Sequence, residues 1–190
     1  MIYDDKTARQ VAKFLLEKEA VVLRPDDPFT WASGWKSPIY CDNRLLLSFP
    51  DVRTFIRLKM GEVVKVHFPD VKTIVGVATA GIPHATLVAD QLNMAMAYAR
   101  SKPKGHGKQN VLEGQIVEGR KVAVIEDLIS TGNSSFSVVD MLRERYITVS
   151  GLVAIFTYDF PIAEQSAKEK DIPFYTLTDY NYLIEEALEM

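Results

Sequence analysis

The sequence is poor in the features that mark several special classes of protein. Its only cysteine is Cys41, so we expect neither an internal disulfide framework nor a multi-cysteine zinc site. No apolar run approaches the roughly 20 residues of a membrane-spanning helix, and no apolar secretory segment follows the acidic start at Asp4 and Asp5. There is also no low-complexity tract, no solenoid repeat and no Gly-x-Gly-x-x-Gly motif. These absences predict a reduced, cytoplasmic protein and weaken any assignment to dinucleotide binding.

What remains is the composition of an ordinary globular domain. The chain has 190 residues, of which 47% are hydrophobic. A chain of this size buries roughly 70% of its unfolded surface, so we expect one domain without a disulfide or metal staple. Charged residues make up 25% of the chain and the net charge is -3. This balance argues against a broad nucleic-acid-binding surface, although it leaves room for a local basic patch.

Short apolar strands alternate with helical patterns along most of the chain. Strands are expected at 73–77, 94–99, 121–125, 149–158 and 174–177. Helices are expected at 7–18 with Thr7 as N-cap, at 51–68, from about Pro83, and at 134–145, 162–170 and 179–188. The alternation predicts an α/β fold with a parallel sheet that helices cover on both faces. Ligands bind such folds at the carboxyl ends of the strands, so chemistry is expected just after Val77, Ala99, Ile125 and Phe156.

The segment after the strand at 121–125 has the chemistry of a sugar-phosphate site. Glu126 and Asp127 end the strand, and a helix starts a few residues later. The free N–H groups and the positive dipole end of that helix would hold an anion. Hydroxyl donors and a glycine that permits close backbone approach lie between them: Ser130, Thr131, Gly132 and Ser134. The two carboxylates are better placed to accept hydrogen bonds from sugar hydroxyls or to bind a hard cation. The alternative is an acidic strand end and an N-capping serine, without a ligand.

Two further segments carry candidate binding residues. The stretch 100–108 holds several cations and no acid, which is typical either of a solvated surface loop or of a flexible lid over a pyrophosphate.

The stretch 29–44 mixes aromatic residues and glycine, which predicts an ordered loop or short hairpin. It could form a slot for a planar ring, with Arg44 as a bidentate partner for a carboxylate. The alternative, favoured for Trp31 and Trp35, is a hydrophobic flap that packs on the core.

The segment from Val122 to Gly132 resembles the phosphoribosyl pyrophosphate (PRPP) signature of the type I phosphoribosyltransferases. Four apolar residues, two acids and a Thr-Gly loop follow one another as in that family. The resemblance implies the type I phosphoribosyltransferase fold, with a central mostly parallel sheet flanked by helices and a small N-terminal hood. A single domain would then span 1–190, with about 1–45 forming the hood and about 46–190 the core. It also implies PRPP contacts from Glu126, Asp127, Leu128, Ile129, Ser130, Thr131, Gly132, Asn133 and Ser134.

The basic stretch resembles the loop of the orotate-using members of this family, whose pattern is Arg-x-x-x-Lys-x-His-Gly. Arg100, Lys104, His106 and Gly107 match that pattern. The resemblance implies that Lys104 stabilises the departing pyrophosphate, that Arg100 and His106 also contact PRPP, and that all three are catalytic. It further implies a homodimer in which the loop at 100–115 is shared across the interface. Ser101 departs from the second lysine that some members carry.

The aromatic stretch resembles the base-binding hood of the same members, which is built around Ser-Gly-x-x-Ser-Pro-x-Tyr and begins here at Ser33. Ala32 replaces a lysine of some relatives, so Ser130 and Arg44 remain the expected orotate contacts. The segment from Ala78 to His84 resembles the family's pyrophosphate-binding turn, with Thr79-Ala80 in place of the Tyr-Lys of some members.

The resemblance implies a reaction of orotate with PRPP that gives orotidine 5′-monophosphate and pyrophosphate, in the synthesis of UMP. Mg²⁺ would be the cofactor, bound mainly through PRPP, and no residue is assigned to it as a direct ligand. No nucleic-acid or membrane partner is expected. Two alternatives stay open: a transferase for a purine base, and a non-enzymatic regulator that binds PRPP and nucleic acid.

Overall fold

The computed structural model describes residues 1–24, 28–30, 36–100 and 111–190. Helices and strands alternate along them: α1 Asp5–Glu17, β1 Val21–Leu23, β2 Phe29–Thr30, β3 Lys36–Ser37, β4 Ile39–Cys41, the 3-10 helix η1 Asn43–Ser48, α2 Pro50–His67, β5 Val71–Val77, α3 Gly81–Leu92, β6 Ala95–Ala99, β7 Leu112–Glu113, β8 Lys121–Ile129, α4 Asn133–Glu144, β9 Val149–Thr157, α5 Pro161–Glu169, β10 Phe174–Asp179 and α6 Tyr180–Glu189. None of these helices is both long and apolar enough to cross a membrane.

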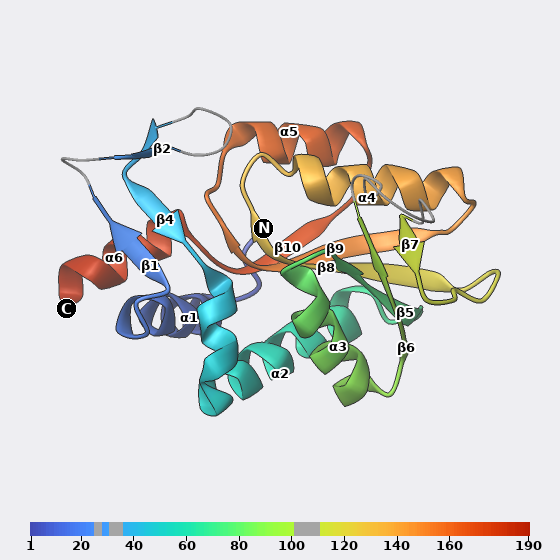
Figure 1. Ribbon diagram of the computed structural model, residues 1–190, viewed down its shortest axis with the longest axis horizontal. Helices are drawn as coiled ribbons and strands as arrows, with labels where there is room; N and C mark the ends of the chain where they lie inside the picture. Colours follow the sequence, from blue (N-terminus) through green and yellow to red (C-terminus); the bar gives the residue numbers. More distant parts are fainter. Residues whose placement is uncertain (25–27, 31–35, 101–110) are drawn as a thin grey trace.

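A six-stranded sheet forms the centre of the molecule, in the order β10-β9-β8-β5-β6-β7. Its strands run parallel, except that β7 pairs antiparallel with β6. Figure 1 shows α4 and α5 on one face of the sheet and α1, α2 and α3 on the other. The predicted α/β fold with a mostly parallel sheet flanked by helices is therefore confirmed.

Strand β8 shows why the apolar runs are uninterrupted. Val122 and Val124 belong to the apolar cluster under α4 and α5, whereas Ala123 and Ile125 belong to the cluster on the other face. All four side chains are fully buried. A strand covered on both faces needs apolar residues at every position, because neither face of the sheet meets water.

Two predicted boundaries are wrong in an informative way. Strand β8 does not end at Ile125 but continues to Ile129, so Glu126 is part of the strand and not of a loop. Pairing with β9 carries it on through Leu128 and Ile129, because Ile129 is fully buried in the core. The N-cap of α1 is Asp4, whose carboxylate accepts a hydrogen bond from the backbone N–H of Thr7.

The segment at 29–44 contains the expected short hairpin, since β2 and β3 pair antiparallel. The sequence analysis missed a second pairing, in which β1 joins β4 antiparallel, with Val22 opposite Tyr40. These four strands lie together at one end of the molecule in Figure 1. We call the segment from β1 to the start of η1, residues 21–44, the hood.

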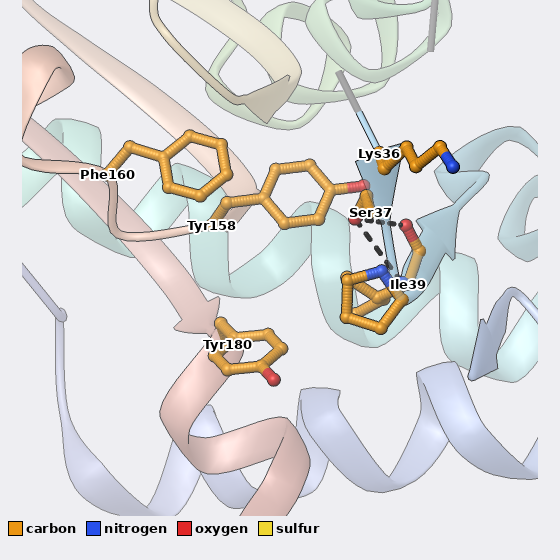
Figure 2. Close-up of a pocket in the computed structure, with 7 residues that line it drawn as sticks. Lys36, Ser37, Ile39, Tyr158, Phe160 and Tyr180 are labelled. Atoms are coloured by element: carbon orange, nitrogen blue, oxygen red, sulfur yellow. Dashed lines mark hydrogen bonds between the residues drawn. The ribbon is translucent and has the colours of Figure 1, made fainter. Parts of the chain in front are cut away.

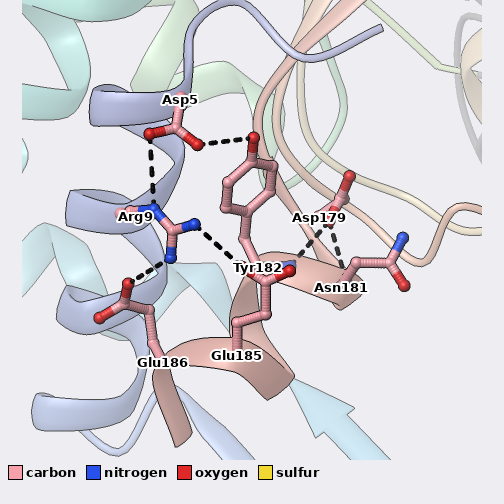
Figure 3. Close-up of polar contacts among 7 residues, drawn as sticks. All are labelled: Asp5, Arg9, Asp179, Asn181, Tyr182, Glu185 and Glu186. Carbon is pink, nitrogen blue, oxygen red and sulfur yellow. Dashed lines mark hydrogen bonds and ion pairs between the residues drawn. The ribbon is translucent and has the colours of Figure 1, made fainter. Parts of the chain in front are cut away.

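Helix α6 is held against α1 by a polar network (Figure 3). Arg9 pairs with Asp5 on its own helix and with Glu185 and Glu186 on α6. The hydroxyl of Tyr182 donates to Asp5 over 3.1 Å. Arg9 is largely exposed, so each ion pair contributes little by itself, and the burial of α6 residues such as Leu183 carries most of the packing.

Candidate active site

A hollow of about 320 Å³ opens at the carboxyl ends of β5 and β8. The hood, the turn after β5, the end of β8 and the start of α4 all contribute to its wall: Cys41, Asp42, Arg44, Ala78, Thr79, Ala80, Glu126, Asp127, Leu128, Ser130 and Ser134. The structure thus gathers at one edge of the sheet the residues that follow Val77 and Ile125, which are two of the four positions where chemistry was expected. It also brings Arg44 to them from a distant part of the sequence.

The start of α4 is open to a ligand. Its N-cap is Gly132, and no side chain caps the first turn. The N-capping serine of the alternative interpretation is therefore not observed. Gly132 has φ +79°, and a Cβ there would lie 2.2 Å from Cε2 of Phe136. Only glycine fits this turn, and the uncapped N–H groups that follow it are suited to an anion.

Glu126 braces the end of β8 against α4. It is only 5% exposed. Its Oε1 accepts a hydrogen bond from the backbone N–H of Asp127, and its Oε2 accepts one from the hydroxyl of Ser135, both over 3.0 Å. Burial, followed by the charge of Asp127, raises the pKa of Glu126 well above its ordinary value. The sequence analysis missed Ser135, although a hydroxyl in the first turn of the helix was a usable signal.

Replacing Glu126 with glutamine should stabilise the protein above neutral pH. The raised pKa means that the folded state binds more protons than the unfolded state, so the free energy of unfolding falls as pH rises from about 4.5 through the raised value. Glutamine keeps the shape and removes this loss, a gain of about 1–2 kcal/mol at pH 8 that should vanish near pH 4. Urea unfolding at both pH values measures it. The exposed Glu144→Gln serves as control, and equal effects of the two variants at pH 8 would contradict the argument.

Asp127 connects the site to the hood. Its carboxyl group lines the hollow, and burial raises its pKa above the usual aspartate value. Its backbone carbonyl accepts a hydrogen bond of 2.7 Å from Nδ2 of Asn43, which is fully buried. The thiol of Cys41 donates to Oδ1 of the same Asn43. No local pattern pointed to Asn43, because the contact joins segments 84 residues apart.

The turn after β5 adds a second uncapped helix start. Ala80 is the N-cap of α3 and offers no side-chain hydrogen bond. A Cβ on Gly81 would lie 2.6 Å from the carbonyl oxygen of Ile125, so glycine lets α3 begin directly against β8. The peptide bond between Ala78 and Thr79 is cis. The backbone N–H of Ala78 donates to Ala99, the residue before Arg100, so Arg100 follows the strand beside this turn.

Arg44 already has a partner within the chain. Its Nε and Nη2 donate to the two carboxylate oxygens of Asp42 over 2.6 and 2.7 Å. This bidentate pair raises the pKa of the guanidinium further, so the group stays charged. Arg44 remains exposed on the wall of the hollow, where another anion can approach it.

The other predicted residues differ in how much of them reaches the hollow. Ile129 is fully buried and Leu128 packs partly on the core, so their backbone is the part most available to a ligand. Thr131, Gly132 and Asn133 form the adjoining turn but not the wall itself. Several residues lie outside the described part of the chain: Trp31, Ala32, Ser33, Trp35, Ser101, Lys104, His106 and Gly107.

A second hollow, of about 330 Å³, lies next to the hood strand β4 (Figure 2). It is lined by Lys36, Ser37, Pro38, Ile39, Tyr158, Phe160 and Tyr180. The rings of Tyr158 and Phe160 are stacked with centroids 5.5 Å apart. Ile39 lines this hollow and Cys41 lines the first, and both side chains lie on the buried face of β4, so the two hollows are neighbours along that strand. Tyr158 was not predicted as a site residue, although it directly follows β9, where chemistry was expected.

The histidines of the described segments do not form a metal site. His84 lies near the start of α3, as expected, where burial lowers its pKa to about 4 and keeps the ring neutral. His67 is exposed, as expected, and stacks on Tyr175 with ring centroids 3.9 Å apart. Among the described residues, no group of three or more His, Cys, Asp or Glu could hold a metal ion.

Comparison with known proteins identifies the class. The profile of the phosphoribosyl transferase domain matches residues 64–186, which is more than half of the chain. The chain is 55% identical to the orotate phosphoribosyltransferase of Bacillus subtilis over 179 residues, which cover 94% of this chain and 83% of that one. The enzyme of the same name from Bacillus pumilus is 56% identical over 181 residues, or 95% and 85% of the two chains. The chain therefore belongs to the orotate phosphoribosyltransferase family.

The structural comparison agrees. The crystal structure of orotate phosphoribosyltransferase from Aeropyrum pernix superposes with a TM-score of 0.83 at 26% identity, covering 95% of this chain and 99% of that chain. Adenine phosphoribosyltransferase from Leishmania donovani has the same fold, with a TM-score of 0.68 at 20% identity. The fold is thus shared with purine transferases, whereas the sequence identity is high to the orotate enzymes.

Proposed function

We propose that the chain transfers the phosphoribosyl group of PRPP to orotate, giving orotidine 5′-monophosphate and pyrophosphate in the synthesis of UMP. The observation that carries the proposal is the uncapped start of α4 beside Asp127, in a hollow that also contains Arg44. A phosphorylated sugar and an acidic base each have a suitable partner there. The family of the chain supports the same reaction.

The 5′-phosphate would lie at the start of α4. Gly132 leaves the backbone N–H groups open, and Ser130, Thr131 and Ser134 supply hydroxyl donors. Asp127 is the better candidate for the ribose hydroxyls, because both oxygens of Glu126 already accept a hydrogen bond within the chain. The ribose would then be held at two points, which orients its anomeric carbon for attack.

The chemical step is a displacement at that carbon. The ring nitrogen of orotate gives up its proton to water and forms the new C–N bond as the C–O bond to pyrophosphate breaks, and the bonding electrons leave with pyrophosphate. Arg100, Lys104 and His106 would balance the charge that develops on the leaving group, as the resemblance of this segment implies. The backbone N–H groups at the start of α3 lie at the same edge of the sheet and can add to this. Burial raises the pKa of Cys41, so its thiol is a poor nucleophile and no covalent intermediate is proposed.

Mg²⁺ is the proposed cofactor, and it would neutralise charge on the pyrophosphate of bound PRPP. The carboxylates at the end of β8 suit a hard cation, yet Glu126 is buried and hydrogen-bonded within the chain. Asp127 is therefore the candidate side chain, and phosphate oxygens and water would supply the remaining ligands. Mg²⁺ commonly binds through one or two carboxylates and substrate phosphates, which this arrangement fits.

Orotate needs a flat apolar surface and a cation. The stacked rings of Tyr158 and Phe160 offer the first, on the hood side of β9 (Figure 2). Arg44 is the candidate partner for the carboxylate, with Ser130 beside it on the same wall. Nε and Nη2 of Arg44 already donate to Asp42, so orotate would accept hydrogen bonds from the remaining N–H groups of the guanidinium.

Replacing Arg44 with glutamine should raise the KM for orotate about tenfold and change the KM for PRPP much less, because it removes a charge-assisted contact to the base only. Initial rates over both substrates test this. Asp42→Asn is the matched control, since it leaves Arg44 in place and frees its donors, and it should not raise the KM for orotate. A larger effect of Arg44→Gln on PRPP than on orotate would contradict the assignment.

The working unit proposed here is a cytoplasmic homodimer of single-domain chains over 1–190, with a hood formed by about 1–45 and a core by about 46–190. The part of the predicted loop at 100–115 that precedes β7 would reach into the partner's site, because Leu112 and Glu113 pair with β6 within the same chain. Analytical ultracentrifugation tests the dimer, and a monomer at working concentration with full activity would exclude it.

The reaction itself is tested by the loss of orotate's ultraviolet absorbance on addition of PRPP and Mg²⁺. A panel of adenine, hypoxanthine and xanthine distinguishes a purine transferase. A regulator would instead show PRPP-dependent nucleic-acid binding at physiological salt without turnover. Failure to consume orotate would reject the proposed function.

A further inference from the structure

A third hollow, of about 290 Å³, lies at the opposite end of the strands from the candidate active site. It opens where β8 and β9 begin. One wall is the turn before β8, and the other is the segment between α4 and β9: Ile116, Val117, Glu118, Gly119, Arg120, Arg145, Tyr146, Ile147 and Thr148. The proposed reaction uses none of these residues.

Each wall carries one arginine, Arg120 and Arg145, and both are exposed. Within the described segments, neither side chain makes a hydrogen bond or an ion pair. Arg143, two residues before Arg145, instead donates to the carbonyls of Lys170 and Asp171. Glu118 is the only acid on the wall, so the hollow has one excess positive charge in a protein of net charge -3. The dipole of α4 favours a cation at the carboxyl end of this helix, which would explain Arg145 without a ligand. It does not explain Arg120, which lies on the other wall.

Tyr146 lies beside these arginines at the carboxyl end of α4, where it has a positive φ and is fully exposed. Its backbone N–H donates to Arg143, and that of Ile147 donates to Leu142, which is the Schellman arrangement at a helix end. The residue in this position has φ +59°, where glycine is favoured. The tyrosine ring is 99% exposed, so contacts within the chain do not explain it. The same helix-end arrangement with a positive φ occurs at Glu19 after α1 and at Asp171 after α5, so it is the exposed ring beside two arginines, and not the backbone, that points to an external ligand.

We propose that this hollow binds a phosphate monoester that carries a planar ring, such as a nucleoside monophosphate. Arg120 and Arg145 would hold the phosphate from two sides, and the ring would stack on Tyr146. Both walls are fixed before binding, because Arg120 donates its backbone N–H to Val117 and Ile147 donates to Leu142. The site is thus preorganised. The proposal does not depend on the reaction proposed above.

The hollow is also connected to the active site through one element. Helix α4 begins at the proposed phosphate cradle and ends at Glu144, next to Arg145. A ligand that contacts the carboxyl end of α4 therefore contacts the same rigid helix whose amino end would hold PRPP.

Calorimetric titration of the full chain with adenosine 5′-monophosphate tests the site, with and without saturating PRPP. The active site can also hold a phosphate, so the expected signature is a component that PRPP does not displace. The double variant Arg120→Ala/Arg145→Ala should weaken that component at least tenfold, whereas Lys65→Ala, which removes an exposed cation on α2, should leave it unchanged. Absence of a PRPP-insensitive component, or its survival in the double variant, would overturn the proposal.

Tyr146→Gly gives a second readout that a structural role would not produce. Glycine relieves the left-handed conformation, so the variant should melt at a higher temperature than the original chain. It should nevertheless bind adenosine 5′-monophosphate several-fold more weakly, and orthophosphate about equally well. If nucleotide binding is unchanged, or if orthophosphate binding falls in parallel, Tyr146 does not hold the ring.

Discussion

Replacing Gly132 with alanine is expected to lower the free energy of unfolding by about 2–4 kcal/mol and to remove most of the turnover. The added Cβ would lie 2.2 Å from Cε2 of Phe136, and the residue would have to keep φ +79°. Phe136 is buried between α4 and the sheet, and it cannot move aside without opening the core. The turn would shift instead, and the N–H groups at the start of α4 would leave their positions. Thermal unfolding and PRPP binding measure the two consequences.

Gly119→Ala is the matched control for this prediction. Gly119 also has a positive φ, of +76°, but a Cβ there would meet nothing within 4 Å. The Gly119→Ala substitution should lower the free energy of unfolding by about 1–2 kcal/mol, which is the cost of the left-handed conformation alone, and leave PRPP binding unchanged. Equal destabilisation by the two substitutions would show that the contact with Phe136 is unimportant.

Replacing Lys104 with alanine is expected to reduce kcat by about 10²–10³-fold while weakening PRPP binding far less. The reason is that a cation placed at the leaving group acts mainly on charge that appears in the transition state. Single-turnover rates and equilibrium PRPP binding separate the two effects. Lys102→Ala, in the same basic stretch, should change kcat much less. A large loss of PRPP affinity with little change in the single-turnover rate would reject this role.

The same variant can report on the shared loop. If the loop enters the partner's site, a mixture of Lys104→Ala with Asp127→Asn should recover activity when subunits exchange. In the mixed dimer one site then carries both defects and the other carries neither. No recovery after verified exchange would place Lys104 in the site of its own chain.

The sequence predicted the core elements because burial imposes a pattern on them. The strand at 121–125 reads as continuous apolar residues after Lys121, since Val124 and Ile125 face opposite apolar layers. The end of that strand could not be read in the same way. Glu126 looks like a boundary, yet its carboxyl is satisfied inside the protein by Ser135, and β8 continues past it.

The hood shows a second limit. Strands of two or three residues, such as β1 and β4, are too short for a two-residue period to be recognised. Their pairing depends on tertiary position, which local propensity does not encode. In the site, local segments such as Ser130 to Ser134 were predictable because neighbours in sequence act together. Asn43 and Tyr158 were not, because distant segments meet at these residues.

The bond from Asn43 to the backbone of Asp127 has a consequence for how the molecule opens. Asn43 is fully buried, so separating the hood from the end of β8 would break this hydrogen bond and open a contact from which water is excluded. Movements that admit substrates should therefore leave the contact between Asn43 and Asp127 intact. Substrates and products should enter and leave on the side of the pocket away from this contact. Amide hydrogen exchange at the carboxyl end of β8 should accordingly be among the slowest in the protein, with or without bound nucleotide.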